Sequence, residues 1–130
     1  VEEHVYFGGR NSNADLTTYF GAADLYISPA HVDGSSVSLL EAMACGLPAI
    51  VSDIPANLEW IKEGENGWIF PDGDDQALAQ AILQAATLDW RTLSLAARQV
   101  AVERADWSKN FQKLLKCYQE TVDYGKVSKA

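Results

Sequence analysis

Basic side chains are scarce in this chain of 130 residues: 10 Lys and Arg stand against 18 Asp and Glu, which gives a net charge of −8. An acidic surface repels phosphate backbones and anionic lipid headgroups, so nucleic acid and an anionic membrane surface are poor partners. The sequence also contains no apolar run long enough to span a bilayer and no recognisable signal peptide. These absences predict a cytoplasmic protein.

Cysteine is rare as well, with only Cys45 and Cys117 in the chain. The two lie far apart in the sequence and have no spacing typical of a metal site. We therefore expect both to be free, buried, small apolar side chains rather than metal ligands or partners in a disulfide.

The residues that are present are typical of a soluble α/β domain, with 48% hydrophobic and 22% charged side chains. A chain of this length can bury enough surface for one domain. Short apolar runs predict strands at residues 5–7, 25–28, 49–51 and 67–70, with helical patterns between and after them. This alternation predicts a Rossmann-like parallel sheet with helices on both faces. Because the chain lacks an initial Met and enters a predicted strand almost at once, we expect a piece of a longer protein, incomplete at its N-terminus.

Residues 33–53, with the sequence DGSSVSLLEAMACGLPAIVSD, are the most informative stretch. They predict a loop, then a helix over residues 37–45 that Gly46 ends, then a buried strand. The first amides of a helix lack intrahelical partners and carry partial positive charge, and the small residues 34–36 leave them open to an anion. Phosphate is the usual ligand of such a site.

Two carboxylates flank this predicted anion site: Asp33 before the loop and Glu41 one turn into the helix. Carboxylates do not bind phosphate but accept hydrogen bonds from sugar hydroxyls, so a phosphorylated sugar fits the pattern better than phosphate alone. A purely structural interpretation is also open, because Ser38 and Glu41 have the S-x-x-E spacing of a capping box. Packing or loop hydrogen bonding explains the nearby His31 better than direct catalysis does.

The same stretch, continued to residue 59, resembles the signature of group 1 glycosyltransferases of family 4, which have the GT-B fold. That signature has two acidic residues separated by seven others, then A-M-A-x-G-x-P, a strand and a further Glu. Asp33 and Glu41 have this spacing, and Glu59 stands at the third acidic position. The resemblance covers residues 5–118, the greater part of a GT-B C-terminal domain. It implies that residues 1–106 are part of a nucleotide-sugar-binding domain and that residues 107–130 are its C-terminal helix and tail.

The resemblance implies roles for the residues that match the family motif. Glu41 would hold the ribose hydroxyls of the nucleotide, and Asp33, the candidate catalytic residue, would contact the hydroxyls of the donor sugar. The backbone amides that would meet the diphosphate and the sugar belong to Ser35, Ser36, Val37 and Ser38. The residues that would lie against the base are Gly9, Arg10 and Asn11.

Members of this family move a sugar, here expected to be a hexose, from a nucleotide diphosphate sugar to an acceptor with retention of configuration. They generally need no metal ion or other cofactor, so the helix N-terminus and basic side chains would stabilise the departing nucleotide diphosphate. The resemblance implies a place in polysaccharide or glycoconjugate synthesis, in the cytoplasm or, for the full-length enzyme, at the inner face of the membrane.

The sequence departs from the family pattern in two respects. Asp33 stands where many members have Glu, which shortens its reach to the sugar. The Arg and Lys that grip the diphosphate in the family lack counterparts, since Arg10 is the only Lys or Arg before Lys62, and the acceptor-binding N-terminal domain is missing too. We therefore expect the donor-binding half of an enzyme, inactive alone. The alternatives are a non-catalytic nucleotide-sugar-binding or interaction module and a GT-B sugar-nucleotide epimerase.

Overall fold

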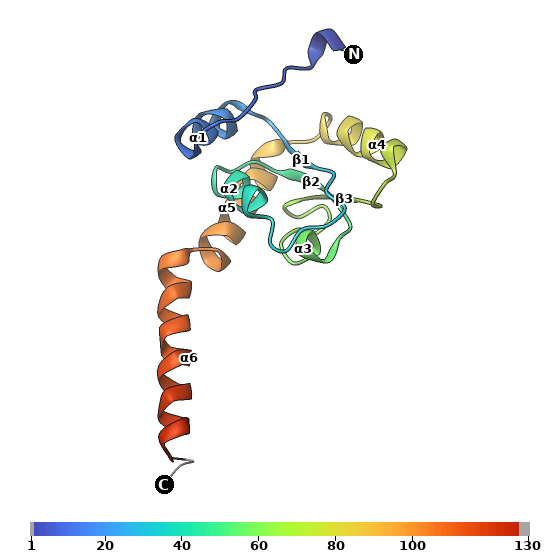
Figure 1. The fold of residues 1–130 in the computed structure, drawn as a ribbon. Helices are drawn as coiled ribbons and strands as arrows, with labels where there is room; N and C mark the ends of the chain where they lie inside the picture. The colour runs from blue at the N-terminus through green and yellow to red at the C-terminus, as the bar shows by residue number, and fades with distance from the viewer. Residues whose placement is uncertain (1, 128–130) are drawn as a thin grey trace.

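The computed structural model describes residues 2–127. Its strands alternate with helices, which confirms the predicted α/β fold class (Figure 1). The elements in chain order are η1 (Glu2–His4), α1 (Asn13–Ala22), β1 (Tyr26–Ser28), α2 (Val37–Ala44), β2 (Ala49–Ser52), α3 (Pro55–Leu58), β3 (Gly67–Phe70), α4 (Asp75–Ala85), α5 (Trp90–Arg104) and α6 (Trp107–Val127).

The sheet consists of three parallel strands in the order β1-β2-β3. Tyr26 of β1 lies opposite Ala49 of β2, which in turn lies opposite Gly67 of β3. These three strands were predicted from the sequence to within one residue at each end. Because the strands are parallel, the loops that follow them gather at one edge of the sheet, where α/β proteins bind their ligands.

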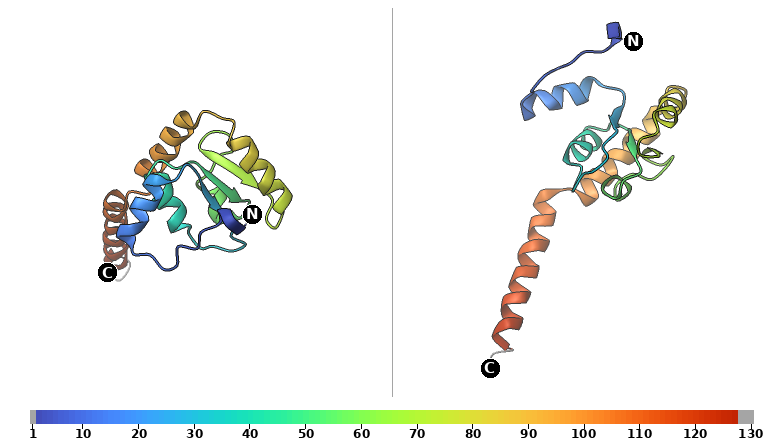
Figure 2. Two further views of the ribbon diagram at one scale, coloured as in Figure 1. Left: turned by 90° about the horizontal axis from the view of Figure 1, so that it is seen from above. Right: turned by 45° about the vertical axis from the view of Figure 1, so that its right-hand side comes forward.

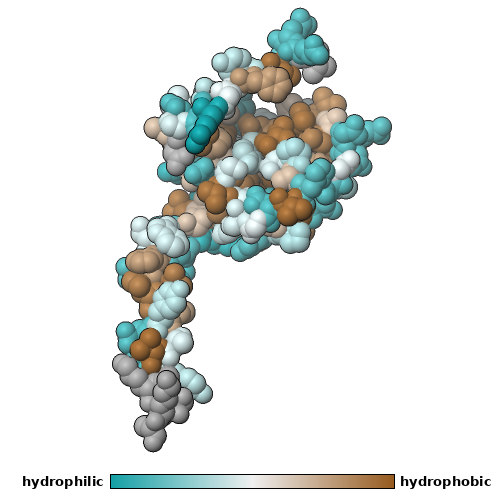
Figure 3. All heavy atoms as spheres, viewed as in Figure 1, coloured by the Kyte–Doolittle hydropathy of each residue, from teal (hydrophilic) through white to brown (hydrophobic). Residues whose placement is uncertain are grey.

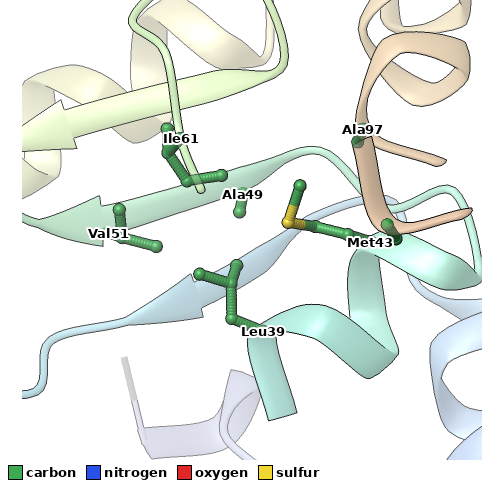
Figure 4. Packing of buried hydrophobic residues seen from close by; sticks show 7 residues of the cluster. Leu39, Met43, Ala49, Val51, Ile61 and Ala97 are labelled. Atoms are coloured by element: carbon green, nitrogen blue, oxygen red, sulfur yellow. The ribbon is translucent and has the colours of Figure 1, made fainter. Parts of the chain in front are cut away.

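Strand β2 is buried on both faces because helices cover both sides of the sheet (Figure 2). Ala49 and Val51 pack with Leu39 and Met43 of α2 in one apolar cluster, which α5 completes (Figure 4). Ile50, between them in the sequence, belongs to a second cluster with side chains of β3 and α4. Side chains of a strand alternate between its faces, so this division confirms the prediction of helices on both sides.

The strand predicted at residues 5–7 is wrong. The short helix η1 is followed there by an irregular segment that runs to α1 away from the sheet (Figure 1). Val5, Tyr6 and Phe7 are 51%, 86% and 89% exposed. These residue types favour strands, but a strand also needs a partner for its backbone groups, and within residues 2–127 this segment pairs with no other strand.

The prediction for the cysteines is half right. Both thiols are free, as expected, but both are exposed rather than buried. Cys45 is the C-cap of α2, which ends at Ala44, one residue before the predicted end. Cys117 lies on α6, a helix whose described side chains all remain at least partly exposed.

Helix α6 extends away from the rest of the fold (Figures 1 and 2). Apolar side chains follow it as brown patches in Figure 3. Its central apolar residues, between 40% and 62% exposed, are Phe111, Leu114, Leu115, Tyr118 and Val122. The helix has 21 residues, but neither it nor another helix in the described part of the chain is long and apolar enough to cross a membrane.

We expect the backbone amides of α6 beyond Phe111 to exchange with solvent deuterium faster than those of β2. A helix of this length without tertiary packing is only marginally stable in water. Hydrogen–deuterium exchange with mass spectrometry measures this directly, at a concentration at which sedimentation shows a monomer. Equal protection of residues 115–124 and of β2 in that monomer would show that α6 packs on the body of the domain.

Candidate functional site

The loops after the three strands are tied together at the carboxyl edge of the sheet. Asp53, directly after β2, accepts a hydrogen bond from the backbone amide of Asp72, after β3, over 2.8 Å. The Asp72 carboxylate in turn lies 2.6 Å from Nδ1 of His31 in the loop after β1. Loops that are distant in the sequence therefore form one connected surface.

The loop between β1 and α2 is shaped by Asp33. Its Oδ1 accepts a hydrogen bond from the backbone amide of Ser35 over 3.1 Å, and its Oδ2 accepts one from Oγ of Ser36 over 2.9 Å. Ser36 is the N-cap of α2 and is 1% exposed. Asp33, three residues before the N-cap, thus holds the start of the helix in place through its side chain. Gly34 and Ser35 stay exposed.

The amides predicted to meet an anion divide into two pairs. Those of Ser35 and Val37 are used within the loop, since Ser35 donates to Asp33 and Val37 donates to the carbonyl oxygen of Ser35 over 2.7 Å. Those of Ser36 and Ser38 have no hydrogen-bond acceptor among the described residues. Ser36 is buried and Ser38 is exposed, so the Ser38 amide is the one that an anion can reach at the positive end of α2.

The capping-box interpretation of Ser38 and Glu41 is wrong. Helix α2 begins at Val37, so Ser38 lies inside it, and its hydroxyl is 2.7 Å from the hydroxyl of Tyr26 on β1. The partly buried carboxylate of Glu41 has no hydrogen-bond or ion-pair partner within the described residues. Glu41 is therefore free to accept hydrogen bonds from a ligand.

Glu41 borders two hollows in the surface. One, of about 220 Å³, lies between α1 and α2 and is lined by apolar side chains that include Leu16 and Phe20. The other, of about 610 Å³, lies between α2 and the junction of α5 and α6, where Val37 and Trp107 line it. Both volumes suit part of a small ligand. The free carboxylate thus stands at the rim of concave, largely apolar surface.

The residues predicted to contact the base lie on the exposed segment before α1. The side-chain amide of Asn11 donates to the carbonyl oxygen of Gly9 over 3.4 Å, and Gly9 has a positive φ of 67°. Arg10 makes no hydrogen bond or ion pair among the described residues. No hydrogen bond or ion pair within the described residues joins this segment to Asp33 or Glu41, so its role at the base stays a prediction.

The start of α1 fixes where this segment ends. Ser12 caps the helix, and its hydroxyl donates to the Asp15 carboxylate over 2.6 Å in a capping box. That hydrogen bond lowers the pKa of the Asp15 carboxyl from its ordinary value. The cap positions the following helical turn, whose Leu16 lines the smaller hollow.

Several residues at this edge were missed by sequence reasoning. Asp72 binds His31, and it could have been suspected because it comes two residues after the end of a predicted strand. Asn57 is completely buried on α3, with its amide oxygen 2.9 Å from Oγ of Ser36. No pattern in the sequence marks it, because a polar residue in a short helix is usually exposed. Hydrogen bonding in the loop, the preferred explanation for His31, is what the structure shows.

The three-stranded parallel sheet and the helices that cover it belong to the class of GT-B glycosyltransferase folds. Sucrose-phosphate synthase of Thermosynechococcus elongatus superimposes with a TM-score of 0.88 at 27% identity, over 94% of this chain and 31% of that one. HepE of Anabaena, in complex with UDP and glucose, gives a TM-score of 0.82 at 26% identity, over 92% of this chain and 33% of that one.

Sequence comparison agrees with the structural likeness. A phosphatidyl-myo-inositol mannosyltransferase of Mycobacterium leprae is 34% identical over 126 residues, which are 95% of this chain and 33% of that protein. The family model for glycosyl transferases group 1 matches residues 1–100. The chain belongs to this family, and it spans about a third of the length of the curated relative.

Replacing His31 with Ala should loosen the loop between β1 and α2. The variant loses the hydrogen bond to Asp72, which on an exposed surface is worth about 0.5–1 kcal/mol. We expect faster deuterium exchange in residues 29–36 and a slightly lower melting temperature. The control is His4→Ala, because His4 lies 3.8 Å from Glu3 on the exposed N-terminal segment. Unchanged exchange in His31→Ala would show that the contact does not restrain the loop.

Proposed function

We propose that this chain is the donor-binding part of a retaining glycosyltransferase that transfers a hexose from a nucleotide diphosphate sugar. The observation that carries the proposal is Glu41, a partly buried residue whose carboxylate has no partner within the described residues, which lies beside two hollows on helix α2. A carboxylate left without donors in a largely apolar setting favours a ligand that supplies them, and ribose hydroxyls do so.

The start of α2 suits the diphosphate of such a donor. The amides of Ser36 and Ser38 lack acceptors among the described residues, and the helix macrodipole adds partial positive charge at the same point. The exposed Ser38 amide and this partial charge would stabilise the charge that develops on the departing nucleotide diphosphate, without help from a metal ion or other cofactor. Asp33, which opens the loop, would present its carboxylate to hydroxyls of the donor sugar.

The relatives support a nucleotide sugar as the ligand. HepE of Anabaena binds UDP and glucose, and a further structure of it contains UDP-glucose. The curated relative from Mycobacterium leprae is a mannosyltransferase. In the whole protein, a separate N-terminal domain would bind the acceptor, so this chain alone would bind donor without transferring the sugar. The setting would be polysaccharide or glycoconjugate synthesis in the cytoplasm.

Glu41→Gln should weaken nucleotide-sugar binding by about 1–3 kcal/mol, because a neutral amide makes weaker hydrogen bonds to the ribose hydroxyls than a carboxylate. Isothermal titration calorimetry of the chain with UDP-glucose and GDP-mannose measures the change. The matched control is Glu65→Gln, since Glu65 makes only a surface ion pair with Lys62 at 3.5 Å. Equal affinities for the wild type and Glu41→Gln, or no binding of any nucleotide sugar by the wild type, would contradict the proposal.

Asp33→Asn should lower turnover strongly in the full-length enzyme and leave the affinity for nucleotide diphosphate nearly unchanged. The asparagine oxygen can still accept from Ser35 or Ser36 and preserve much of the loop, whereas the negative charge facing the sugar is lost. Steady-state kinetics and calorimetry on the same preparation separate the two effects. If turnover stays near normal, Asp33 only shapes the loop.

A further inference from the structure

Asn57 is a fully buried polar residue that contacts Ser36 of the proposed donor site. It lies on the short helix α3 and is 0% exposed. Its side-chain amide nitrogen donates to the carbonyl oxygen of Ser52, over 3.0 Å, and contacts the Ser52 hydroxyl at 3.2 Å. Its amide oxygen accepts from Oγ of Ser36 over 2.9 Å. One side chain therefore connects the end of β2 to the start of α2.

The orientation of the Asn57 amide follows from its partners. The carbonyl oxygen of Ser52 can only accept, so the amide nitrogen must face β2 and the amide oxygen must face Ser36. The Ser52 hydroxyl donates onward to the carbonyl oxygen of Ala30, in the loop that leads from β1 to Asp33. Both ends of the β1–α2 loop are thus connected to Asn57, one through Ser52 and the other through Ser36.

The hydroxyl of Ser36 is the point where this network reaches the site. It lies 2.9 Å from Oδ2 of Asp33 and 2.9 Å from the amide oxygen of Asn57, so a single hydrogen serves two acceptors. Its position is consequently fixed from both sides. Ser36 is also the N-cap of α2, so its position fixes where the helix begins.

We propose that Asn57 is a positioning residue of the donor site. By accepting a hydrogen bond from the Ser36 hydroxyl, it fixes the N-cap of α2, and with it the direction of the first amides of the helix and of the Asp33 carboxylate. It touches no donor atom itself and acts only through Ser36 and Ser52. The inference rests on the proposed function, because it assigns Asn57 to the binding of a nucleotide diphosphate sugar.

A purely structural role would predict a different result, and the chain contains a matched residue for comparison. Asn66 is 2% exposed, its amide oxygen accepts from the backbone amide of Lys62 over 2.8 Å, and its amide nitrogen donates to the carbonyl oxygen of Trp60 over 2.9 Å. These contacts lie in the segment between α3 and β3 and do not reach the loop between β1 and α2. Removing either asparagine deletes the hydrogen bonds of a buried side chain, so both changes should lower stability.

The experiment compares Asn57→Ala and Asn66→Ala with the wild-type chain. Melting temperature reports stability, and calorimetry with UDP-glucose and GDP-mannose, at a temperature where all three proteins are folded, reports affinity. We expect both variants to melt at a lower temperature. Only Asn57→Ala should bind the nucleotide sugar about fivefold or more weakly than the wild type, the change expected when a buried hydrogen bond is lost.

Asn57→Asp provides a second test if Asn57→Ala does not fold. It has nearly the same shape, but its carboxylate cannot donate to Ser52 and places a further negative charge beside the Asp33–Ser36 contact. We expect weaker binding again. In addition, the effects of Ser36→Ala and Asn57→Asp on affinity should not be independent. The fold-loss of affinity in the double variant should be smaller than the product of the fold-losses in the two single variants.

The outcomes distinguish the role of Asn57 from the function itself. Equal loss of affinity in the Asn57 and Asn66 variants, or unchanged affinity in both, would overturn the positioning role while the wild-type chain still binds nucleotide sugar. Independent effects of Ser36→Ala and Asn57→Asp would overturn it as well. Absence of nucleotide-sugar binding by the wild type would overturn both proposals together.

Discussion

The burial of β2 on both faces is the constraint on which the rest of the structure depends. Ala49, Ile50 and Val51 are all 0% exposed, so each backbone group of this strand must be paired within the protein. Strands β1 and β3 supply these partners, and close approach is required on the β3 side. A side chain at Gly67 would clash with the carbonyl oxygen of Ala49, which explains glycine at that position. The sheet therefore has one register, and with it one arrangement of the loops at its carboxyl edge.

Different faces of helix α2 contribute to the hydrophobic core and to the proposed site. Leu39 and Met43 lie on the face that packs against β2 and are completely buried. Ser38 and Glu41 lie away from the buried cluster, and the N-terminus of the helix stands at the edge of the sheet. Because packing of the first face fixes the helix, the backbone positions of Ser38 and Glu41 are fixed with it. Changes in the core would accordingly affect the site through the position of α2.

The sequence was sufficient to predict the central unit of the fold and the loop–helix–strand pattern on which the proposed site rests. Strand β2, helix α2 and the spacing of Asp33 and Glu41 are all local patterns, and local patterns are visible in a single sequence. The failures concern properties that depend on distant partners. Residues 5–7 have the composition of a strand, but no strand pairs with them in the described chain. Cys117 has apolar neighbours on α6, but the body of the domain does not cover that helix.

The network around Asn57 could not have been predicted for a related reason. Its members Ser36, Ser52 and Asn57 are separated by up to 21 positions, and each is a residue type common in turns. Only the parallel register brings the end of β2 beside the start of α2. Asp72 and His31, 41 positions apart, are a similar case. The residues proposed to contact the ligand were suggested by a local motif, whereas the contacts of Asn57 became visible only in the folded chain.

The excess of acidic residues raises the question of how such a chain could hold a diphosphate. Its carboxylates at the sheet edge would repel phosphate if they were unpaired. However, the Asp33 carboxylate accepts from Ser35 and Ser36, the Asp53 carboxylate accepts from the amide of Asp72, and the Asp72 carboxylate lies against His31. Hydrogen-bond donors thus offset these charges within the protein. Glu41 differs, because its carboxylate has no donor in the described chain, and one turn of helix separates it from the free amides. Because of this separation, the unpaired Glu41 carboxylate would meet the sugar hydroxyls of a bound donor rather than its phosphate oxygens.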